Sequence, residues 1–141
     1  MLSTLLILVP AALADPTVTI HAERSRIPSG EEIVATVENA MGEPIFVPAC
    51  ETMQVEAFDA EQGRWLPSPS RGCKETKVAV ALPEGSHTLT ASFAAERFTV
   101  IRLVLVFGLR CREGFALEMA GCEDLRAAIS GNLTVAPPAE E

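Results

Sequence analysis

The sequence predicts an all-β domain, an antiparallel β-sandwich of seven to nine strands with two disulfide-tied loops. Three observations lead to this fold class. Short runs of residues alternate apolar and polar side chains with a period of two, which is typical of half-buried strands. Clusters of Pro, Gly, Asn and Asp separate these runs at short intervals, as turns do in a sandwich. An even number of cysteines is available for bridges, namely Cys50, Cys73, Cys111 and Cys122.

The first fourteen residues have features of a secretory signal peptide. Residues 5–13 are apolar, and Ala12-Leu13-Ala14 places small residues where a signal peptidase cuts, so cleavage is expected before Asp15. No Lys or Arg follows Met1, which leaves a buried first strand as the alternative. The predicted organisation is a signal peptide over residues 1–14, the sandwich over 15–136 and a disordered tail over 137–141.

The length and the net charge of the chain limit the classes of partner that it is expected to bind. Removing 14 of the 141 residues leaves 127, enough for one domain. The net charge is −8 and the eleven Lys and Arg residues are scattered, which argues against nucleic acid and anionic lipid. The apolar run 103–107 lies between Arg102 and Arg110, so no membrane insertion is expected after signal cleavage. We expect a monomer located in the periplasm or secreted.

The first two strands show the alternation most clearly. Residues 17–23 and 31–38 carry apolar side chains at every second position, and residues 27–30 between them are typical of a turn. The side chains expected to face the core are Val18, Ile20, Ala22, Ile33, Ala35 and Val37.

Two further strands are predicted over residues 44–47 and 53–59, paired as a hairpin near Cys50. Residues 61–73 have a strand pattern only briefly at 64–66, and they contain Pro67, Pro69 and Gly72. A loop restrained by a bridge to Cys50 is therefore expected there.

Strands resume at residue 76. Residues 76–82 alternate through Val78, Val80 and Leu82, and 89–93 alternate after a turn at 83–86. Residues 98–107 are apolar on both faces in their second half, which predicts a central strand covered on each side.

A last strand, residues 132–136, is expected to pair with the central one. Between them lies the longest irregular excursion, residues 108–131, which contains Cys111 and Cys122. Its acidic piece, residues 123–128, is predicted to form one or two helical turns.

Four cysteines allow three disulfide connectivities, and spacing does not choose among them. We expect the local pairing, Cys50 with Cys73 and Cys111 with Cys122, because each bridge would close one excursion between strands. Each would stabilise the fold by about 3 kcal/mol through the entropy of the unfolded chain. A metal site is the alternative, although no Cys-x-x-Cys or His-x-x-His spacing occurs. No cofactor is expected.

Four short motifs occur in the order of a known family: Thr17-Val18-Thr19-Ile20, Ile27-Pro28-Ser29-Gly30-Glu31 before a strand ending in Glu38-Asn39, Leu82-Pro83-Glu84-Gly85, and Ser130-Gly131-Asn132-Leu133-Thr134-Val135. In this order they resemble bacterial extracytoplasmic immunoglobulin-like domains, especially those related to the BsuPI-type proteinase inhibitor. The chain departs from that pattern at Ser29, which separates the Pro and Gly of the turn, and at Phe98, where Tyr is usual. The resemblance implies an immunoglobulin-like sandwich and a candidate inhibitory activity.

No catalytic site is predicted. The two histidines, His21 in a strand and His87 at a strand entrance, lack an accompanying nucleophile motif, so His21 is expected to face solvent. Copper binding is a further alternative, because Met41, Met53 and Met119 accompany these histidines.

Recognition by loops on a rigid scaffold remains as the leading interpretation. Phe115, Leu117 and Met119 alternate within the excursion closed by Cys111 and Cys122, and they either form an exposed apolar tip or fold back onto the sandwich. Trp65 is either a second contact or a plug beneath the Cys50 loop. The sequence thus predicts a noncatalytic protein-binding or envelope accessory domain. The alternatives are a proteinase inhibitor with a disulfide-constrained loop and a periplasmic copper-binding protein.

Overall fold

The computed structural model describes residues 17–68, 78–93 and 99–136. These residues form an all-β structure with eleven strands and a short 3-10 helix, Leu117–Met119. Seven to nine strands were predicted, and the count is higher because short segments such as β2 (Arg26–Pro28) and β6 (Arg64–Pro67) also pair. The leader, the tail and Cys73 lie outside the described residues.

A three-stranded antiparallel sheet contains β1 (Val18–Ala22), β3 (Ile33–Asn39) and β8 (Gly85–Ala91), in the order β1-β3-β8. Strand β3 is central, with Ile20 opposite Val37 on one side and Leu89 opposite Ala35 on the other. The alternation in β1 and β3 is confirmed, since Val18, Ile20, Ile33, Ala35 and Val37 are buried and Ala22 packs against the core.

The second sheet has eight strands, arranged along the path β2-β11-β9-β4-β7, with β10 and β5 also paired to β9 and β6 paired to β5. Its remaining strands are β4 (Ile45–Pro48), β5 (Gln54–Asp59), β7 (Ala79–Leu82), β9 (Val100–Leu109), β10 (Asp124–Ile129) and β11 (Leu133–Ala136). One pair, β2 with β11, is parallel, whereas all pairs were expected to be antiparallel.

Strand β9 is the central strand of this sheet. Along one edge it pairs first with β11 and then with β10, and along the other first with β5 and then with β4. Ten residues give β9 the length to hold four partners. The predicted central strand and its pairing with the last strand are therefore confirmed, two residues further along the chain than expected at each end of β9. The expected cover on both faces is not complete, because Val106 on the outer face is 39% exposed.

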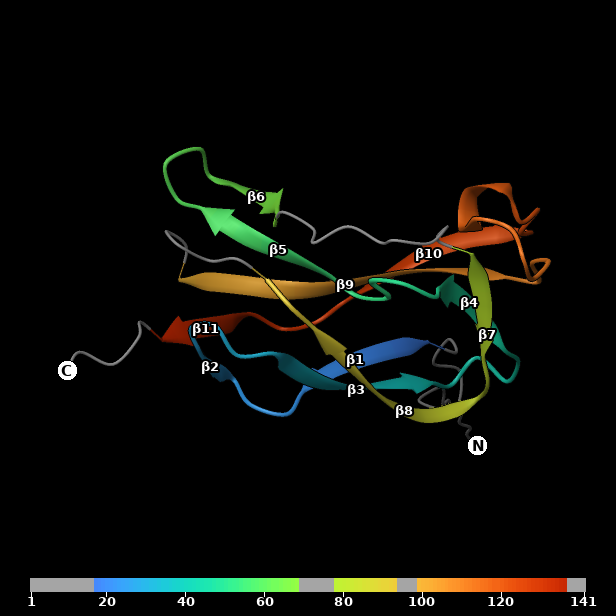
Figure 1. Ribbon diagram of the computed structural model, residues 1–141, viewed down its shortest axis with the longest axis horizontal. Helices are drawn as coiled ribbons and strands as arrows, with labels where there is room; N and C mark the ends of the chain where they lie inside the picture. Colours follow the sequence, from blue (N-terminus) through green and yellow to red (C-terminus); the bar gives the residue numbers. More distant parts are fainter. Residues whose placement is uncertain (1–16, 69–77, 94–98, 137–141) are drawn as a thin grey trace, which may run out of the picture.

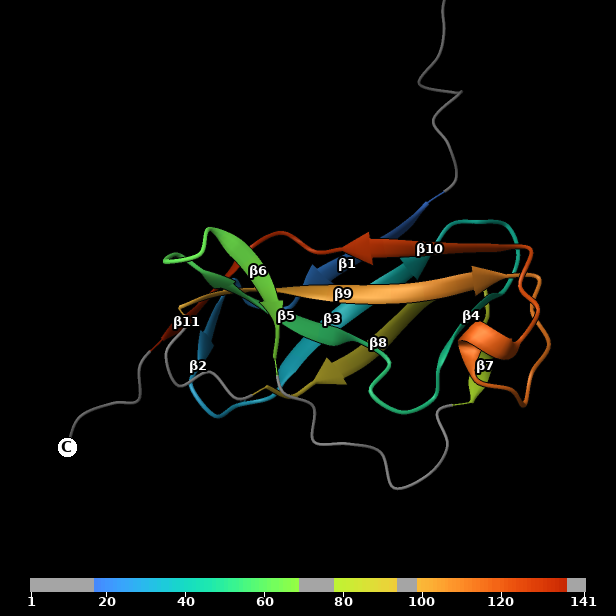
Figure 2. The same cartoon turned by 90° about the horizontal axis from the view of Figure 1, so that it is seen from above.

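The two sheets lie in two layers, with β1, β3 and β8 below β5, β9 and β10 in Figure 1, and Figure 2 shows the same arrangement from above. One cluster of buried side chains joins them. It contains Ile33 and Val37 of the smaller sheet together with Ile45, Leu103 and Leu105 of the larger sheet, all fully inaccessible to solvent. Burial of this kind is the main favourable contribution to folding.

Two pairing predictions are wrong. Strands β4 and β5 do not form a hairpin with each other, because each lies against a different half of β9. Residues 64–67, expected within a loop, instead form β6 and pair with β5. In that hairpin the Asp59 carboxylate accepts hydrogen bonds from the backbone N–H groups of Glu61 (2.9 Å) and Gln62 (3.2 Å).

The predicted helical turns over 123–128 are also wrong. This segment is strand β10, paired with β9 from Asp124 opposite Leu109 to Ile129 opposite Val104. Strand pairing overrides the local helix preference of its acidic and alanine residues. In β7 the buried residue is Ala79, while Val80, one of the alternating apolar residues of this segment, is 37% exposed.

Asn39 joins the two sheets at the end of β3. Its side-chain N–H groups donate to the carbonyl of Glu43 (2.9 Å) and to that of Leu82 (3.1 Å), which lies on β7 of the other sheet. Its carbonyl oxygen accepts from the backbone N–H of Met41 (3.0 Å). The side chain is buried and its polar atoms are paired, so it contributes without the cost of an unsatisfied group.

Replacing Asn39 with Ala should lower the free energy of unfolding by about 2 kcal/mol, because three partly buried backbone groups lose the hydrogen bonds that the buried Asn39 side chain makes with them. The measurement is urea denaturation followed by the fluorescence of Trp65, the single tryptophan. The matched control is Asn132→Ala, since Asn132 is exposed and should change stability by less than about 0.5 kcal/mol. Equal stability of the two variants would contradict the inter-sheet role of Asn39.

Candidate functional site

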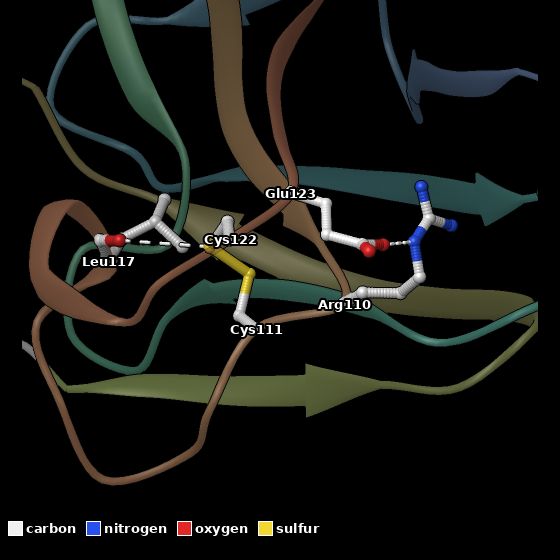
Figure 3. Close-up of a disulfide and its surroundings, with 5 residues drawn as sticks. All are labelled: Arg110, Cys111, Leu117, Cys122 and Glu123. Atoms are coloured by element: carbon white, nitrogen blue, oxygen red, sulfur yellow. Dashed lines mark hydrogen bonds and ion pairs between the residues drawn. A yellow bond between two sulfur atoms is a disulfide. The ribbon is translucent and has the colours of Figure 1, made fainter.

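The loop between β9 and β10 is closed by a disulfide between Cys111 and Cys122, with an S–S distance of 2.01 Å (Figure 3). The predicted pairing of these two cysteines is confirmed. Cys50 is also disulfide-bonded, but its expected partner Cys73 lies outside the described residues, so that pairing stays a prediction.

Arg110 fixes the entrance to this loop. Its backbone has φ of 53°, a left-handed conformation that ends β9 and turns the chain. Its guanidinium forms ion pairs with Glu43, at 2.7 Å, and with Glu123 at the start of the returning chain. Figure 3 shows Arg110 and Glu123 beside the disulfide. The two ends of the loop are therefore held by a covalent bond and by an ion pair.

The loop folds back over the larger sheet. Its Leu117 and Ala120 are buried against Ala79 of β7, and Phe46 and the two bridged cysteines pack around them. Both sulfur atoms lie directly over Gly108 of β9, where an added Cβ would be 2.5 Å from each of them. Only glycine at position 108 allows this approach.

Backbone hydrogen bonds attach the loop to β7. The N–H of Ala79 donates to the carbonyl of Phe115 (2.7 Å), and Val78 and Ala116 form an antiparallel bridge. Within the loop, the N–H of Arg112 donates to the carbonyl of Ala120 (2.8 Å). These bonds give the loop one defined conformation.

The three apolar residues expected to act together are divided by this packing. Leu117 is 7% exposed and belongs to the buried cluster, whereas Phe115 is 45% exposed and Met119 is 69% exposed. The division follows from the 3-10 helix, because its turn sends Leu117 and Met119 in different directions, unlike the alternation of a strand. The guanidinium of Arg112 lies 4.6 Å from the centre of the Phe115 ring.

Trp65 lies elsewhere on the larger sheet. Its ring meets the edge of Phe58, with 5.3 Å between ring centres, and the guanidinium of Arg102 lies 4.1 Å from the Trp65 ring. Arg102 is in turn paired with Glu56 at 2.7 Å. Figures 1 and 2 place β6, which carries Trp65, and the disulfide loop at opposite ends of the sheet. Trp65 and Phe115 therefore do not form one contact site.

An apolar stripe on β9 and β10 is a feature that was not predicted from the sequence. Val106 is 39% exposed, Leu125 is 51% exposed and Ile129 is 52% exposed, and all three lie on the outer face of the larger sheet. The signal was present, because Leu125, Ala127 and Ile129 alternate as in a strand. It was overlooked because the segment was interpreted as helical.

The candidate catalytic and metal-binding residues are dispersed. His21 is exposed on β1, as predicted, and a ring nitrogen of His87 lies 2.7 Å from the carbonyl of Pro83. Met41 and Met53 pack in the core, while Met119 is on the disulfide loop. In the part of the chain that the structure describes, no three His, Cys, Asp or Glu side chains gather into a group able to hold a metal.

No family model, no curated protein and no solved structure matches the chain. Among the described residues, no helix has the length and apolar character needed to span a bilayer.

Replacing Gly108 with Ala should lower stability by about 1–3 kcal/mol, because the new methyl group must displace both sulfur atoms. The same substitution should cost less in a Cys111→Ala, Cys122→Ala background, where the sulfur atoms are gone and only the Cβ of residue 122, 3.2 Å from the added Cβ, remains close. Urea denaturation measures these losses in a double-mutant cycle. The four proteins are the wild type, the Gly108→Ala variant, the Cys111→Ala, Cys122→Ala variant and the variant that combines all three substitutions. Gly131→Ala is the control, since an added Cβ there meets nothing within 4 Å. Equal losses with and without the bridge would show that Gly108 is not required by the disulfide.

Proposed function

We propose that this protein is a noncatalytic, extracytoplasmic immunoglobulin-like β-sandwich that binds another protein through its disulfide-tied loop. The observation that carries the proposal is the combination of exposed apolar side chains, Phe115 and Met119, with a loop held rigid by the Cys111–Cys122 bridge. A rigid loop loses little conformational freedom on binding, so more of the contact energy remains as affinity.

The immunoglobulin-like architecture is supported by how the chain passes between the sheets. The first two strands lie in different sheets: β1 is in the smaller sheet, and β2 is at the edge of the larger sheet. The chain then crosses between the layers from β3 to β4, from β7 to β8 and from β8 to β9. Repeated crossings between two packed, largely antiparallel sheets are typical of this class of sandwich.

The extracytoplasmic location is supported by two independent features. The leader over residues 1–14 has the pattern of a signal peptide. The Cys111–Cys122 bridge is compatible with this location, because disulfides persist in oxidising compartments and are rare in the cytosol.

Protein binding is preferred here over proteinase inhibition. An inhibitor that binds the enzyme by adding its loop as a strand needs free backbone groups in that loop. In this loop the carbonyl of Phe115 is already bonded to Ala79, and Ala116 is bridged to Val78. The side chains of Phe115 and Met119 remain available, which favours recognition through side chains.

A photo-crosslinking residue, benzoyl-phenylalanine, placed at Phe115 or at Met119 should give a discrete adduct with another protein when the full chain is made in its source cells. The reason is that both side chains are exposed on a fixed loop. Adducts are detected by a mass shift after ultraviolet irradiation. The same residue at Thr88, which is exposed on β8 of the other sheet, is the control and should give none.

The proposal fails if the crosslinker at Phe115 and Met119 gives no adduct, as at Thr88. It also fails if all three positions give the same heterogeneous mixture of adducts. The purified chain should also leave a panel of serine, cysteine and metalloproteinases uninhibited at micromolar concentration. Stoichiometric inhibition of any of them would favour the inhibitor interpretation instead.

A further inference from the structure

The exposed stripe on β10 differs from the sheet edges formed by β8, β2 and β6. The outward side chains of β8 are Ser86, Thr88 and Thr90, which are polar. Strands β2 and β6 contain a proline each, and both have an exposed arginine. Strand β10 instead exposes Leu125, Ala127 and Ile129 in a row. Natural proteins usually protect a free strand edge with charge or proline, because an unprotected edge recruits another strand.

The edge of β10 that faces away from β9 has backbone groups available for such pairing. The N–H of Ser130 donates to the carbonyl of Leu103 on β9 (2.9 Å), so residues 124, 126 and 128 also direct their N–H and C=O groups towards β9. By the same alternation, Leu125, Ala127 and Ile129 direct theirs outward. Strand β9 is the only strand among the described residues that pairs with β10, and Figure 2 shows β10 along the margin of the sheet.

We propose that two copies of this chain associate by antiparallel pairing of β10 with β10 of the second copy. The pattern is self-complementary about Ala127. With Ala127 of both copies on the two-fold axis, Leu125 of each copy lies opposite Ile129 of the other, and these are the residues whose backbone groups point outward. The two apolar pairs lie on the same outer face as Val106, and cross-strand pairs of this type stabilise sheets.

The charges on β10 are compatible with this register. Arg126 is neutralised within its own copy by Asp124, with 2.8 Å between the guanidinium nitrogen and the carboxylate. Opposite them in the second copy lie Ala128 and Ser130, which are uncharged. No like charges face each other directly. The repulsion that remains comes from the net charge of −8 on each copy, which salt screens.

The test is sedimentation velocity of the purified chain with its disulfides intact, over a concentration series at low and high sodium chloride. We expect a monomer–dimer equilibrium whose dimer is at least tenfold more stable at high salt. Ile129→Lys should weaken the dimer at least tenfold, and Ala127→Pro should do so by removing an outward N–H while leaving the bonds to β9 in place. Met119→Lys is the matched control and should leave the dimer unchanged, because Met119 is exposed on the disulfide loop.

Circular dichroism of each variant establishes that it is folded, and Ile129→Lys carries the test if the proline variant is not. A monomer at every concentration up to millimolar and at both salt levels would overturn the proposal. So would a dimer that responds to Met119→Lys but not to Ile129→Lys. Neither result bears on the adducts expected at Phe115, which are distinguished by mass from a crosslinked second copy.

The register is tested separately by engineered cysteines. Ala127→Cys should form an intermolecular disulfide under mild oxidation, because facing residues of a hydrogen-bonded pair have Cα atoms about 5.5 Å apart. Leu125→Cys should not, because the two copies of residue 125 would be offset by four residues, about 13 Å. Nonreducing electrophoresis reads out both. Equal crosslinking of the two variants would overturn the proposed register.

Discussion

The structure depends on the burial of β9. This strand presents Ile101, Leu103, Leu105, Phe107 and Leu109 to the core while four other strands share its two edges. Each of those partners is short, and a two-stranded pairing of such strands is only marginally stable in water. Their order therefore follows from β9, and so does the position of the disulfide loop, which begins where β9 ends. Stability and the presentation of the loop are consequences of one ten-residue strand.

Much of this fold could be predicted from periodicity. The alternation of β1 and β3 and the apolar character of β9 are visible in the chain because each depends mainly on which residues are buried. The partners of the strands could not be predicted in the same way. That β4 and β5 both pair with β9, and not with each other, is decided by where along β9 each strand lies, which no local pattern records. Strand β10 could not be predicted for the same reason, because its pairing with β9 overrides the local helix preference of its residues.

The candidate site was predictable in part. The local pairing of Cys111 and Cys122 was expected from their position in one long excursion, whereas the sequence left open whether Phe115 and Met119 are exposed or fold back. The burial of Leu117 depends on packing with Phe46 and Ala79, which are far away in the sequence. The outward stripe of Leu125 and Ile129 depends on strand pairing, and it became visible only once β10 had a neighbour.

The contact between the disulfide and β9 has a consequence for recognising relatives of this protein. The sulfur atoms occupy the space that a side chain at position 108 would need. A descendant or ancestor that keeps this bridge must therefore keep glycine three residues before the first of the two bridged cysteines. Gly108-Leu109-Arg110-Cys111 is thus a short signature with a steric origin. A homologue that has lost both cysteines is released from that restriction and is free to carry a larger residue there.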